Sequence, residues 1–197
     1  MTPAVIFLNG PPRAGKDTLA NHLCRVLPGF RNVKLSAVLK ERTHALYGMP
    51  YAPHDAFEAV KGEPHPEFMG LTPRQAYINV SEMLFKPAHG ADVFGRILAE
   101  YMEAAAEGAL LPGFVVSDSG FAAEAAPIVE RFGAVNCQLV RIHAEGRGCS
   151  FAGDSRSFIE LPGVRTADLH NDAPDPAGFL SRGAWLVRDF LEGRADA

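Results

Sequence analysis

The sequence predicts an α/β fold in three layers, with a mostly parallel, five-stranded sheet between two layers of helices. Two observations predict this fold. The first is a glycine-rich loop at residues 10–18, which lies between an apolar run at residues 4–8 and an amphipathic helical segment. The second is the alternation of strand-like and helix-like segments along the chain, which is typical of a parallel sheet covered by helices. With 197 residues and 47% hydrophobic content, the chain suits one domain with one sizeable core.

The loop at residues 10–18 reads Gly-Pro-Pro-Arg-Ala-Gly-Lys-Asp-Thr. Glycines at this spacing let successive backbone N–H groups turn towards phosphate oxygens, and the N-terminus of the following helix adds partial positive charge. The side chain of Lys16 adds a full positive charge. Because a strand precedes this loop and a helix follows it, we predict a phosphate-binding loop that holds a nucleotide.

After the first helix, a short strand is expected at residues 32–35. Ser36 is the expected N-cap of the next helix, because its hydroxyl would accept a hydrogen bond from a backbone N–H of the first turn. That helix is expected to end near Gly48. Residues 50–70 are polar and rich in proline, which predicts an irregular excursion between the two halves of the fold.

Two amphipathic helices are expected after this excursion. Thr72 before Pro73 predicts an N-cap followed by proline at the first helical position, and Asp92 is the expected cap of the second helix. In each helix, apolar residues at spacings of three and four form a stripe that is expected to face the core. These stripes are Ala76, Tyr77, Val80, Met83 and Leu84, and then Val93, Phe94, Ile97, Leu98, Tyr101 and Met102.

The second half of the chain is expected to supply three more strands, at residues 114–118, 138–142 and 167–170. A helix at residues 122–132 is expected to separate the first two. A polar turn at residues 171–175 leads into a last helix. These elements complete the predicted sheet and both of its helical layers.

Composition excludes several classes of function. A formal net charge of −4 argues against general nucleic-acid binding, which requires a basic excess. No apolar stretch approaches the roughly 20 residues that span a bilayer, so we expect a cytoplasmic protein without membrane contact. The three cysteines, Cys24, Cys137 and Cys149, lack the spacing of a zinc site.

Chemistry is expected at the carboxyl ends of the parallel strands. Arg13, within the loop, is expected to reach phosphate oxygens, although a solvated loop arginine is the alternative. Asp17 stands where such loops usually have the Ser or Thr that contacts Mg²⁺, and its carboxylate would bind the ion directly or through water. Thr18 is then left for the α-phosphate. Asp118 ends its strand, and we favour a contact with Mg²⁺-bound water over the alternative of a helix cap.

Phosphoryl transfer between two anions requires positive side chains on both flanks of the site. The loop at residues 141–157 has the composition of a short lid, whose Arg141, Arg147 and Arg156 would act on the transferred phosphate. The alternative is an ordinary surface loop in which Arg156 pairs with Asp154. Lys40 and Arg74 are the expected contacts of the acceptor's phosphate. Tyr77 either stacks on an acceptor base or belongs to the core.

These residues resemble the bacteriophage-type deoxynucleoside monophosphate kinases, a branch of the nucleoside monophosphate kinase group of P-loop proteins. The resemblance covers most of the chain, and its most specific element is the loop, in which Asp17 and Thr18 replace the usual Ser or Thr. Two departures stand out, since Ala14 replaces a frequent serine and residues 119–121 lack an arginine found in some relatives. We expect a lid arginine to take over its task. Weaker matches stand in the family's order at residues 35–40, 72–75, 115–118 and 168–172.

The resemblance implies one P-loop kinase domain over residues 1–197, with an acceptor-binding insertion at about 48–110 and a lid at about 141–157. It implies transfer of the γ-phosphate of ATP, with Mg²⁺, to a nucleoside or deoxynucleoside 5′-monophosphate. It also implies small nucleotide partners, and a homodimer or a monomer fits it equally well. The ATP-binding residues that it implies are Gly10, Arg13, Ala14, Gly15, Lys16, Asp17 and Thr18, with Asn171 and Asp172 near the adenine.

Two other functions stay open from the sequence. One is a P-loop kinase of a different small phosphorylated acceptor, since animal-type phosphomevalonate kinases have a similar Gly-Lys-Asp loop. The other is a nucleotide-binding protein without turnover, in which the lid arginines would be dispensable.

Overall fold

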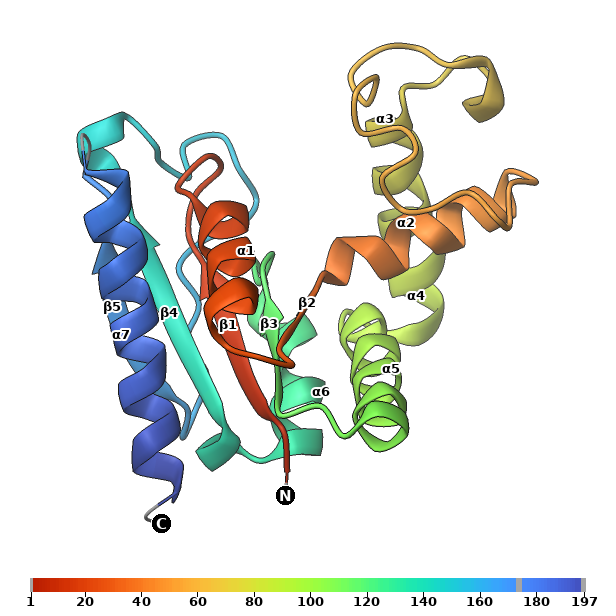
Figure 1. Ribbon diagram of the computed structural model, residues 1–197. Coiled ribbons are helices and arrows are strands. Elements are labelled where there is room, and N and C mark those ends of the chain that lie inside the picture. The colour runs from red at the N-terminus through yellow and green to blue at the C-terminus, as the bar shows by residue number, and fades with distance from the viewer. Residues whose placement is uncertain (1, 173–174, 196–197) are drawn as a thin grey trace.

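The sheet of the computed structural model, which describes residues 2–172 and 175–195, has five strands that all run parallel, in the order β2-β3-β1-β4-β5 (Figure 1). The predicted α/β fold is therefore confirmed. The strands are β1 (Ala4–Asn9), β2 (Arg31–Val33), β3 (Gly113–Val116), β4 (Cys137–His143) and β5 (Arg165–His170). The helices are α1 (Lys16–Val26), α2 (Leu35–Leu46), α3 (Pro73–Asn79), α4 (Lys86–His89), α5 (Val93–Ala109), α6 (Ala122–Phe132) and α7 (Pro176–Ala195), with helical turns η1 (Pro66–Phe68), η2 (Val80–Phe85), η3 (Ala134–Asn136) and η4 (Glu145–Arg147).

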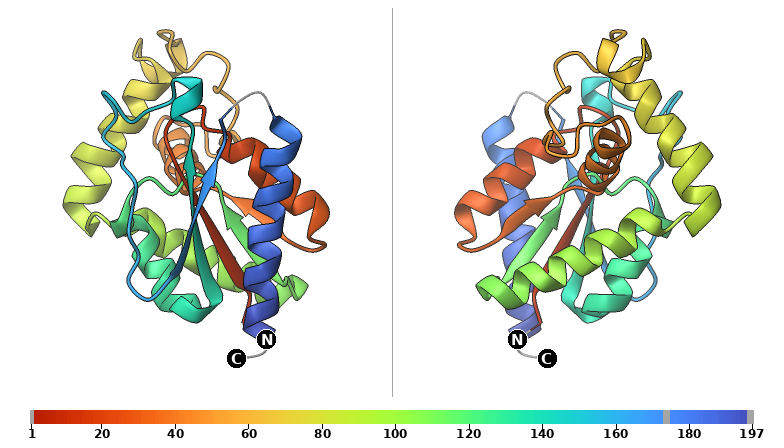
Figure 2. Two further views of the ribbon diagram at one scale, coloured as in Figure 1. Left: turned by 90° about the vertical axis from the view of Figure 1, so that its left-hand side faces the viewer. Right: turned by 90° about the vertical axis from the view of Figure 1, so that its right-hand side faces the viewer.

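Helices cover both faces of the sheet, as the two side views show (Figure 2). Alternate residues of a strand face opposite sides, so β1 contributes to two separate cores. Ile6 and Leu8 pack with α1 and α7, while Val5 and Phe7 pack with α5 and α6. All six residues of β1 are buried, which places this strand at the centre of the molecule and the loop that follows it at the carboxyl edge of the sheet.

The start of α2 corrects one expected cap and assigns one carboxylate. The N-cap position is Lys34, not Ser36, and no side chain of that region caps the helix. Instead, the two carboxylate oxygens of Asp118 accept hydrogen bonds from the backbone N–H groups of Leu35 and Ser36, both at 2.8 Å. A cap from the end of β3 is possible because β2 and β3 are neighbours in the sheet. Asp118 thus caps α2 rather than the next helix along the chain, α6.

Residues 47–89, which belong to the insertion expected at about 48–110, have a small aromatic core of their own; we refer to residues 47–89 below as the insertion. Phe68 is fully buried at its centre, with Ala76 and Tyr77 from α3 against it. Phe57, from the Pro-rich excursion, meets Phe68 edge to face with ring centroids 4.9 Å apart. The buried His44 of α2 joins this core through a 2.9 Å hydrogen bond with the Tyr77 hydroxyl. Within residues 50–70, Phe57 and Phe68 therefore anchor an otherwise largely exposed segment to this core.

The start of α3 is as predicted, but the stripe after it is not. Thr72 and Gln75 form a reciprocal capping box around the first turn. Beyond α3 the chain winds into η2, a π-helical turn, which changes the angular position of each following side chain. Met83 and Leu84 are therefore 77% and 49% exposed instead of facing the core.

Two further expectations change in detail. Tyr101 of the predicted second stripe is 55% exposed, while its neighbours Leu98 and Met102 are buried. Residues 141–143 of the expected lid belong to β4, which continues to His143; we refer to the residues that follow, up to 157, as the lid segment. Residues 173–174 of the expected polar turn lie outside the described residues.

Of the helices in the described residues, none has both the length and the apolar character that crossing a bilayer requires.

Candidate active site

The loop between β1 and α1 has the backbone that a phosphate-binding loop requires. Gly10 approaches the Ile142 carbonyl so closely that a Cβ there would lie 2.7 Å from its oxygen. Gly15 has a φ of +101°, in the left-handed region that favours glycine, and α1 begins at the next residue. Arg13 has a φ of 64° without being glycine, and such conformations cluster at functional sites. The exposed side chain of Arg13 is free to turn towards a ligand.

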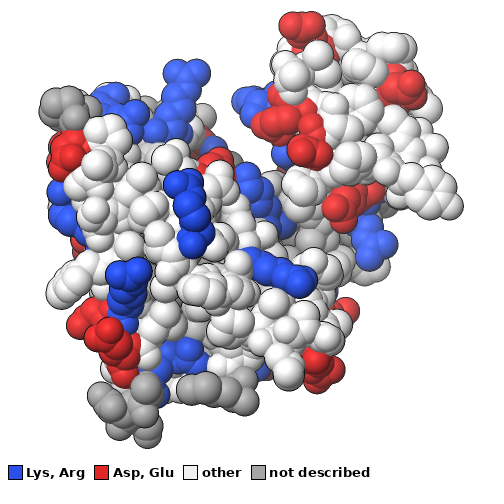
Figure 3. Space-filling model, viewed as in Figure 1, with Lys and Arg blue, Asp and Glu red and all other residues white. Residues whose placement is uncertain are grey.

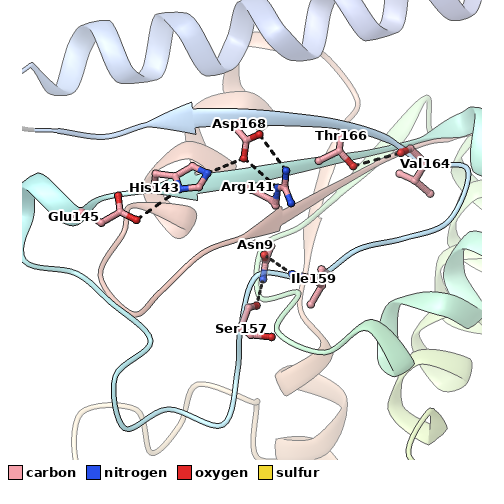
Figure 4. Close-up of polar contacts among 9 residues, drawn as sticks. All are labelled: Asn9, Arg141, His143, Glu145, Ser157, Ile159, Val164, Thr166 and Asp168. Carbon is pink, nitrogen blue, oxygen red and sulfur yellow. Dashed lines mark hydrogen bonds and ion pairs between the residues drawn. The ribbon is translucent and has the colours of Figure 1, made fainter.

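Two buried asparagines support this loop, one at each end. Asn9 donates from Nδ2 to the carbonyl oxygen of Ser119 at 2.7 Å. Its Nδ2 also donates to the carbonyl oxygen of Ser157 (3.0 Å), and its Oδ1 accepts from the backbone N–H of Ile159 (3.1 Å) (Figure 4). Asn9 therefore ties the start of the loop to the exit of β3 and to the lid segment. No role for Asn9 was predicted from the sequence, although a polar residue that ends a buried apolar strand is a visible signal.

Asn171 supports the other end. Its Nδ2 donates to the Ala14 carbonyl oxygen at 2.8 Å, and the residue is 5% exposed. Asn171 is a residue that the resemblance places near the adenine, and in the structure its buried amide holds the loop at the Ala14 carbonyl. Asp172 is exposed and accepts a hydrogen bond from the Gly146 backbone N–H at 3.2 Å, which joins the turn after β5 to the lid segment.

Lys16 lies at the mouth of the loop. Its ammonium donates to the carbonyl oxygens of Gly10 (2.6 Å) and Pro11 (2.7 Å). Burial, and next to it the positive charge of Arg156, lower the pKa of Lys16, while nearby carboxylates including Asp118 oppose this change. Besides the adjacent Asp17, charged groups from two other segments of the chain therefore act on the ammonium, namely Asp118 and the pair Asp154 and Arg156.

The two expected metal ligands differ in their surroundings. The Asp17 carboxylate is 67% exposed and pairs with the Lys34 ammonium at 2.6 Å. Asp118 is partly buried, and both of its oxygens already accept hydrogen bonds from α2. In the described part of the chain, no three His, Cys, Asp or Glu side chains are grouped to hold a metal ion. The protein thus offers single carboxylates rather than a complete cage.

A notch separates the insertion from the rest of the molecule, and Lys and Arg side chains lie on both sides of it (Figure 3). A cavity of about 320 Å³ lies between these parts. The structure brings the predicted Arg74 and Tyr77 together there with Asp118 and Arg156. Lys40 stands beside the cavity, where its ammonium pairs with Glu58 at 2.7 Å and lies 5.9 Å from the centre of the Tyr77 ring. Tyr77 is both a member of the aromatic core and a wall of the cavity.

Lys86, Glu82 and Glu124 also line the cavity, and no role for them was predicted from the sequence. Lys86, from α4, pairs with Glu82 at 2.8 Å and lies 3.8 Å from Glu124. Glu124 is 8% exposed, and its burial raises its pKa to about 7, an effect that Lys86 opposes and the Asp118 charge reinforces. Because Lys86 lies in α4 and Glu124 in α6, no local sequence motif could predict that they meet.

The three lid arginines have three different environments. Arg156 lines the cavity and pairs with Asp154, its Nε donating to Oδ1 at 2.8 Å. The expected pair with Asp154 is therefore present, and the role of Arg156 in a lid stays a prediction. Arg147 is exposed in η4. Arg141 lies on β4 and donates to both carboxylate oxygens of Asp168, at 3.0 and 3.1 Å, an arrangement that also includes His143 (Figure 4). The Arg141 side chain is therefore paired with a carboxylate of β5, and Arg141 itself lies in a strand and not in a loop.

Comparison with known proteins identifies the fold. Neither a protein-family model nor a curated protein matches the sequence. The solved structure of TT1252 from Thermus thermophilus is similar, with a TM-score of 0.54 at 18% identity, covering 97% of this chain and 99% of that one. An unliganded sugar kinase from Janibacter sp. HTCC2649 has a TM-score of 0.53 at 12% identity, covering 96% and 95%. At these identities the likeness concerns the fold alone, which is a five-stranded parallel sheet with helices on both faces.

Proposed function

We propose that the protein transfers the γ-phosphate of ATP to a nucleoside or deoxynucleoside 5′-monophosphate, giving ADP and a nucleoside diphosphate. The observation that carries this proposal is the position of the cavity. Asp118 and Arg156 line it, and the charges of the same two residues act on Lys16 in the phosphate-binding loop. A donor held by the loop and an acceptor held in the cavity would therefore present their phosphates to each other.

The reaction joins two anions without a nucleophilic side chain. An oxygen of the acceptor's phosphate attacks the γ-phosphorus, the bond from that phosphorus to the β–γ bridging oxygen breaks, and the electron pair remains on ADP. The protein contributes position and positive charge. Lys16 and Arg13 serve the donor side, while Arg156 and Arg74 serve the acceptor side. In the described residues no carboxylate lies within 4 Å of the Arg74 guanidinium, which leaves that side chain available to an acceptor's phosphate.

Arg147 and Arg141 have smaller roles in this proposal. Arg147 lies in η4, beside the Gly146 backbone that contacts Asp172, and would approach the donor's phosphates from the lid. Arg141 reaches a phosphate only after its bidentate pair with Asp168 opens. A tight pair of this kind is costly to break, so we place Arg141 last among the catalytic arginines.

The residues present fit Mg²⁺ bound together with ATP. Magnesium ions in kinases usually keep several waters and take one or two carboxylates in addition to the substrate's phosphates. Asp17 offers an exposed carboxylate next to the loop, once its pair with Lys34 opens. Asp118 keeps lone pairs for an ordered water while it caps α2. When bound, the ion would neutralise charge on the β- and γ-phosphates.

A second acceptor class is favoured by one observation. Three carboxylates, those of Glu82, Asp118 and Glu124, line the cavity. Carboxylates accept hydrogen bonds from hydroxyl groups, and one of the similar structures is a sugar kinase. A small hydroxylated acceptor, phosphorylated or not, is therefore the alternative to a nucleotide. The phosphomevalonate-type reaction falls in this class.

One assay separates these acceptors. Purified protein is incubated with ATP and Mg²⁺ and each of the common ribonucleoside and deoxyribonucleoside monophosphates, and products are identified by mass. A parallel panel contains free and phosphorylated sugars and phosphomevalonate. We expect a diphosphate from at least one nucleotide. Product from the second panel alone would replace the proposal by the hydroxylated acceptor, and ATP binding without any product would identify a non-catalytic binder.

A further inference from the structure

Gly120 occupies an unusual place beside the cavity. It is buried in the turn between β3 and α6, two residues after Asp118. A Cβ added there would lie 2.5 Å from Cδ and 2.7 Å from Cγ of Arg156, closer than real side chains approach. The aliphatic stem of Arg156 therefore fills the volume that any side chain at position 120 would need.

Backbone conformation does not explain this glycine. The glycines with φ in the left-handed region do not include Gly120, so alanine fits its backbone. The contact with Arg156 is thus the constraint that the structure shows at this position. It is also specific, since the three nearest atoms to the added Cβ all belong to that one arginine.

The other end of Arg156 is held just as closely. Its backbone N–H and Nε both donate to Asp154 Oδ1, at 3.0 and 2.8 Å, and Nη2 donates to Oδ2. Its side chain is 34% exposed, so most of it is enclosed. With the stem lying over Gly120 and the fork on Asp154, the guanidinium comes close enough to Lys16 for its charge to act on the loop.

We propose that Gly120 is a positioning residue for phosphoryl transfer: by lacking a side chain, it leaves the path along which Arg156 reaches the phosphates between the loop and the cavity. This inference rests on the proposed function, in which Arg156 acts on the transferred phosphate. A methyl group at position 120 would push the stem of Arg156 away from β3 and misplace its guanidinium. Displacement of a catalytic group by about 1 Å is enough to cost as much as 10²-fold in rate.

The test is a double-mutant cycle of Gly120→Ala and Arg156→Ala, with Gly108→Ala as control. Gly108 lies in α5, has no atom within 4 Å of an added Cβ and has no left-handed backbone. We expect Gly120→Ala to lower kcat at least ~10-fold with KM for ATP within about two-fold of wild type. The double variant should be no slower than Arg156→Ala, because the added methyl group then meets open space.

Two outcomes would overturn the inference. One is wild-type kcat in Gly120→Ala, and the other is a double variant in which the two losses multiply. Melting temperature provides a check on folding. If Gly120→Ala melts early, Arg156→Ala must restore its melting temperature, since removal of the stem relieves the clash. Failure to restore it would locate the damage elsewhere and contradict the proposed contact.

A readout without catalysis keeps this test apart from the proposed function. The Nε–H resonance of Arg156, assigned by its loss in Arg156→Lys, is followed by NMR in each variant. We expect it to shift in Gly120→Ala and to stay unchanged in Gly108→Ala. If wild type phosphorylates no acceptor, the proposed function fails while this resonance still decides whether Gly120 positions Arg156. An unchanged resonance in Gly120→Ala overturns the inference whatever the activity.

Discussion

The sheet body and the insertion build their cores in different ways. Strand residues such as Ile6 and Val115 are fully buried between helices that cover both faces, and neighbouring strands support one another along their whole length. The insertion instead gathers aromatic side chains from separate turns around Phe68. The sheet body therefore distributes its stability over many aliphatic contacts, whereas the insertion depends on one anchor. The candidate active site lies where these two parts meet.

The largest effect on activity is expected from a substitution in the sheet body that removes a charge from the site without disturbing the core. Lys16→Ala removes a full charge from the loop and should lower phosphoryl transfer by about 10³-fold. Lys61→Ala is the matched control, because Lys61 pairs with Glu58 on the surface of the insertion. Steady-state kinetics and circular dichroism measure both variants. Retained turnover in Lys16→Ala would refute the site.

A substitution at Phe68, the anchor of the insertion, should weaken acceptor binding without weakening ATP binding. Phe68→Ala leaves a cavity among aromatic rings and should cost about 3 kcal/mol of unfolding free energy. Because the cavity wall contains Tyr77, we expect a raised KM for the acceptor while the Kd for ATP stays within two-fold. Denaturant titration, kinetics and calorimetry measure these effects, with exposed Leu110→Ala as control. Equal weakening of ATP would show that the two parts are not separable.

The free energy of unfolding should depend on pH through Glu124, which lies near Lys86 where the insertion meets the sheet body. Glu124, whose burial raises its pKa to about 7, binds more protons in the folded than in the unfolded protein between its ordinary value of 4.5 and that pH. Its contribution to stability is therefore complete below pH 4.5 and is lost as pH rises through about 7, by about 3 kcal/mol in all. Glu124→Gln should remove this dependence. Unfolding titrations at several pH values test it, and equal slopes in both proteins would contradict the raised pKa.

The smallest effect is expected at the edge of the loop. Asp17→Ala removes a carboxylate that is exposed and paired with Lys34. We expect a several-fold increase in the Mg²⁺ concentration that gives half-maximal activity, because one ligand of the ion is replaced by water. Glu103→Ala, which removes a carboxylate paired with Arg131 between α5 and α6, is the control. A metal titration indistinguishable from wild type would remove Asp17 from the proposed metal site.

Agreement between sequence and structure follows the same division of the molecule. The buried strands and the loop at residues 10–18 are predictable because their patterns are local: an apolar run, two glycines and a helical stripe. The register after α3 is not, since the π-helical turn that exposes Met83 leaves no local signal. The site divides likewise. Lys16 and Arg74 could be named in advance, while Lys86 and Glu124 meet only through the insertion.

By itself, the sequence determined the α/β class, the order of the elements and the place of the glycine-rich loop between β1 and α1, because hydrophobic period and glycine spacing act over a few residues. Tertiary structure alone decided which polar side chains work together. Asp118 caps α2 across the sheet, Asn9 and Asn171 hold the two ends of the loop, and Arg156 passes over Gly120. The hydrogen bonds among these contacts join residues that are 82 to 157 positions apart in the sequence. Only the packed fold brings such residues within hydrogen-bonding distance, and it likewise brings the Arg156 side chain against Gly120.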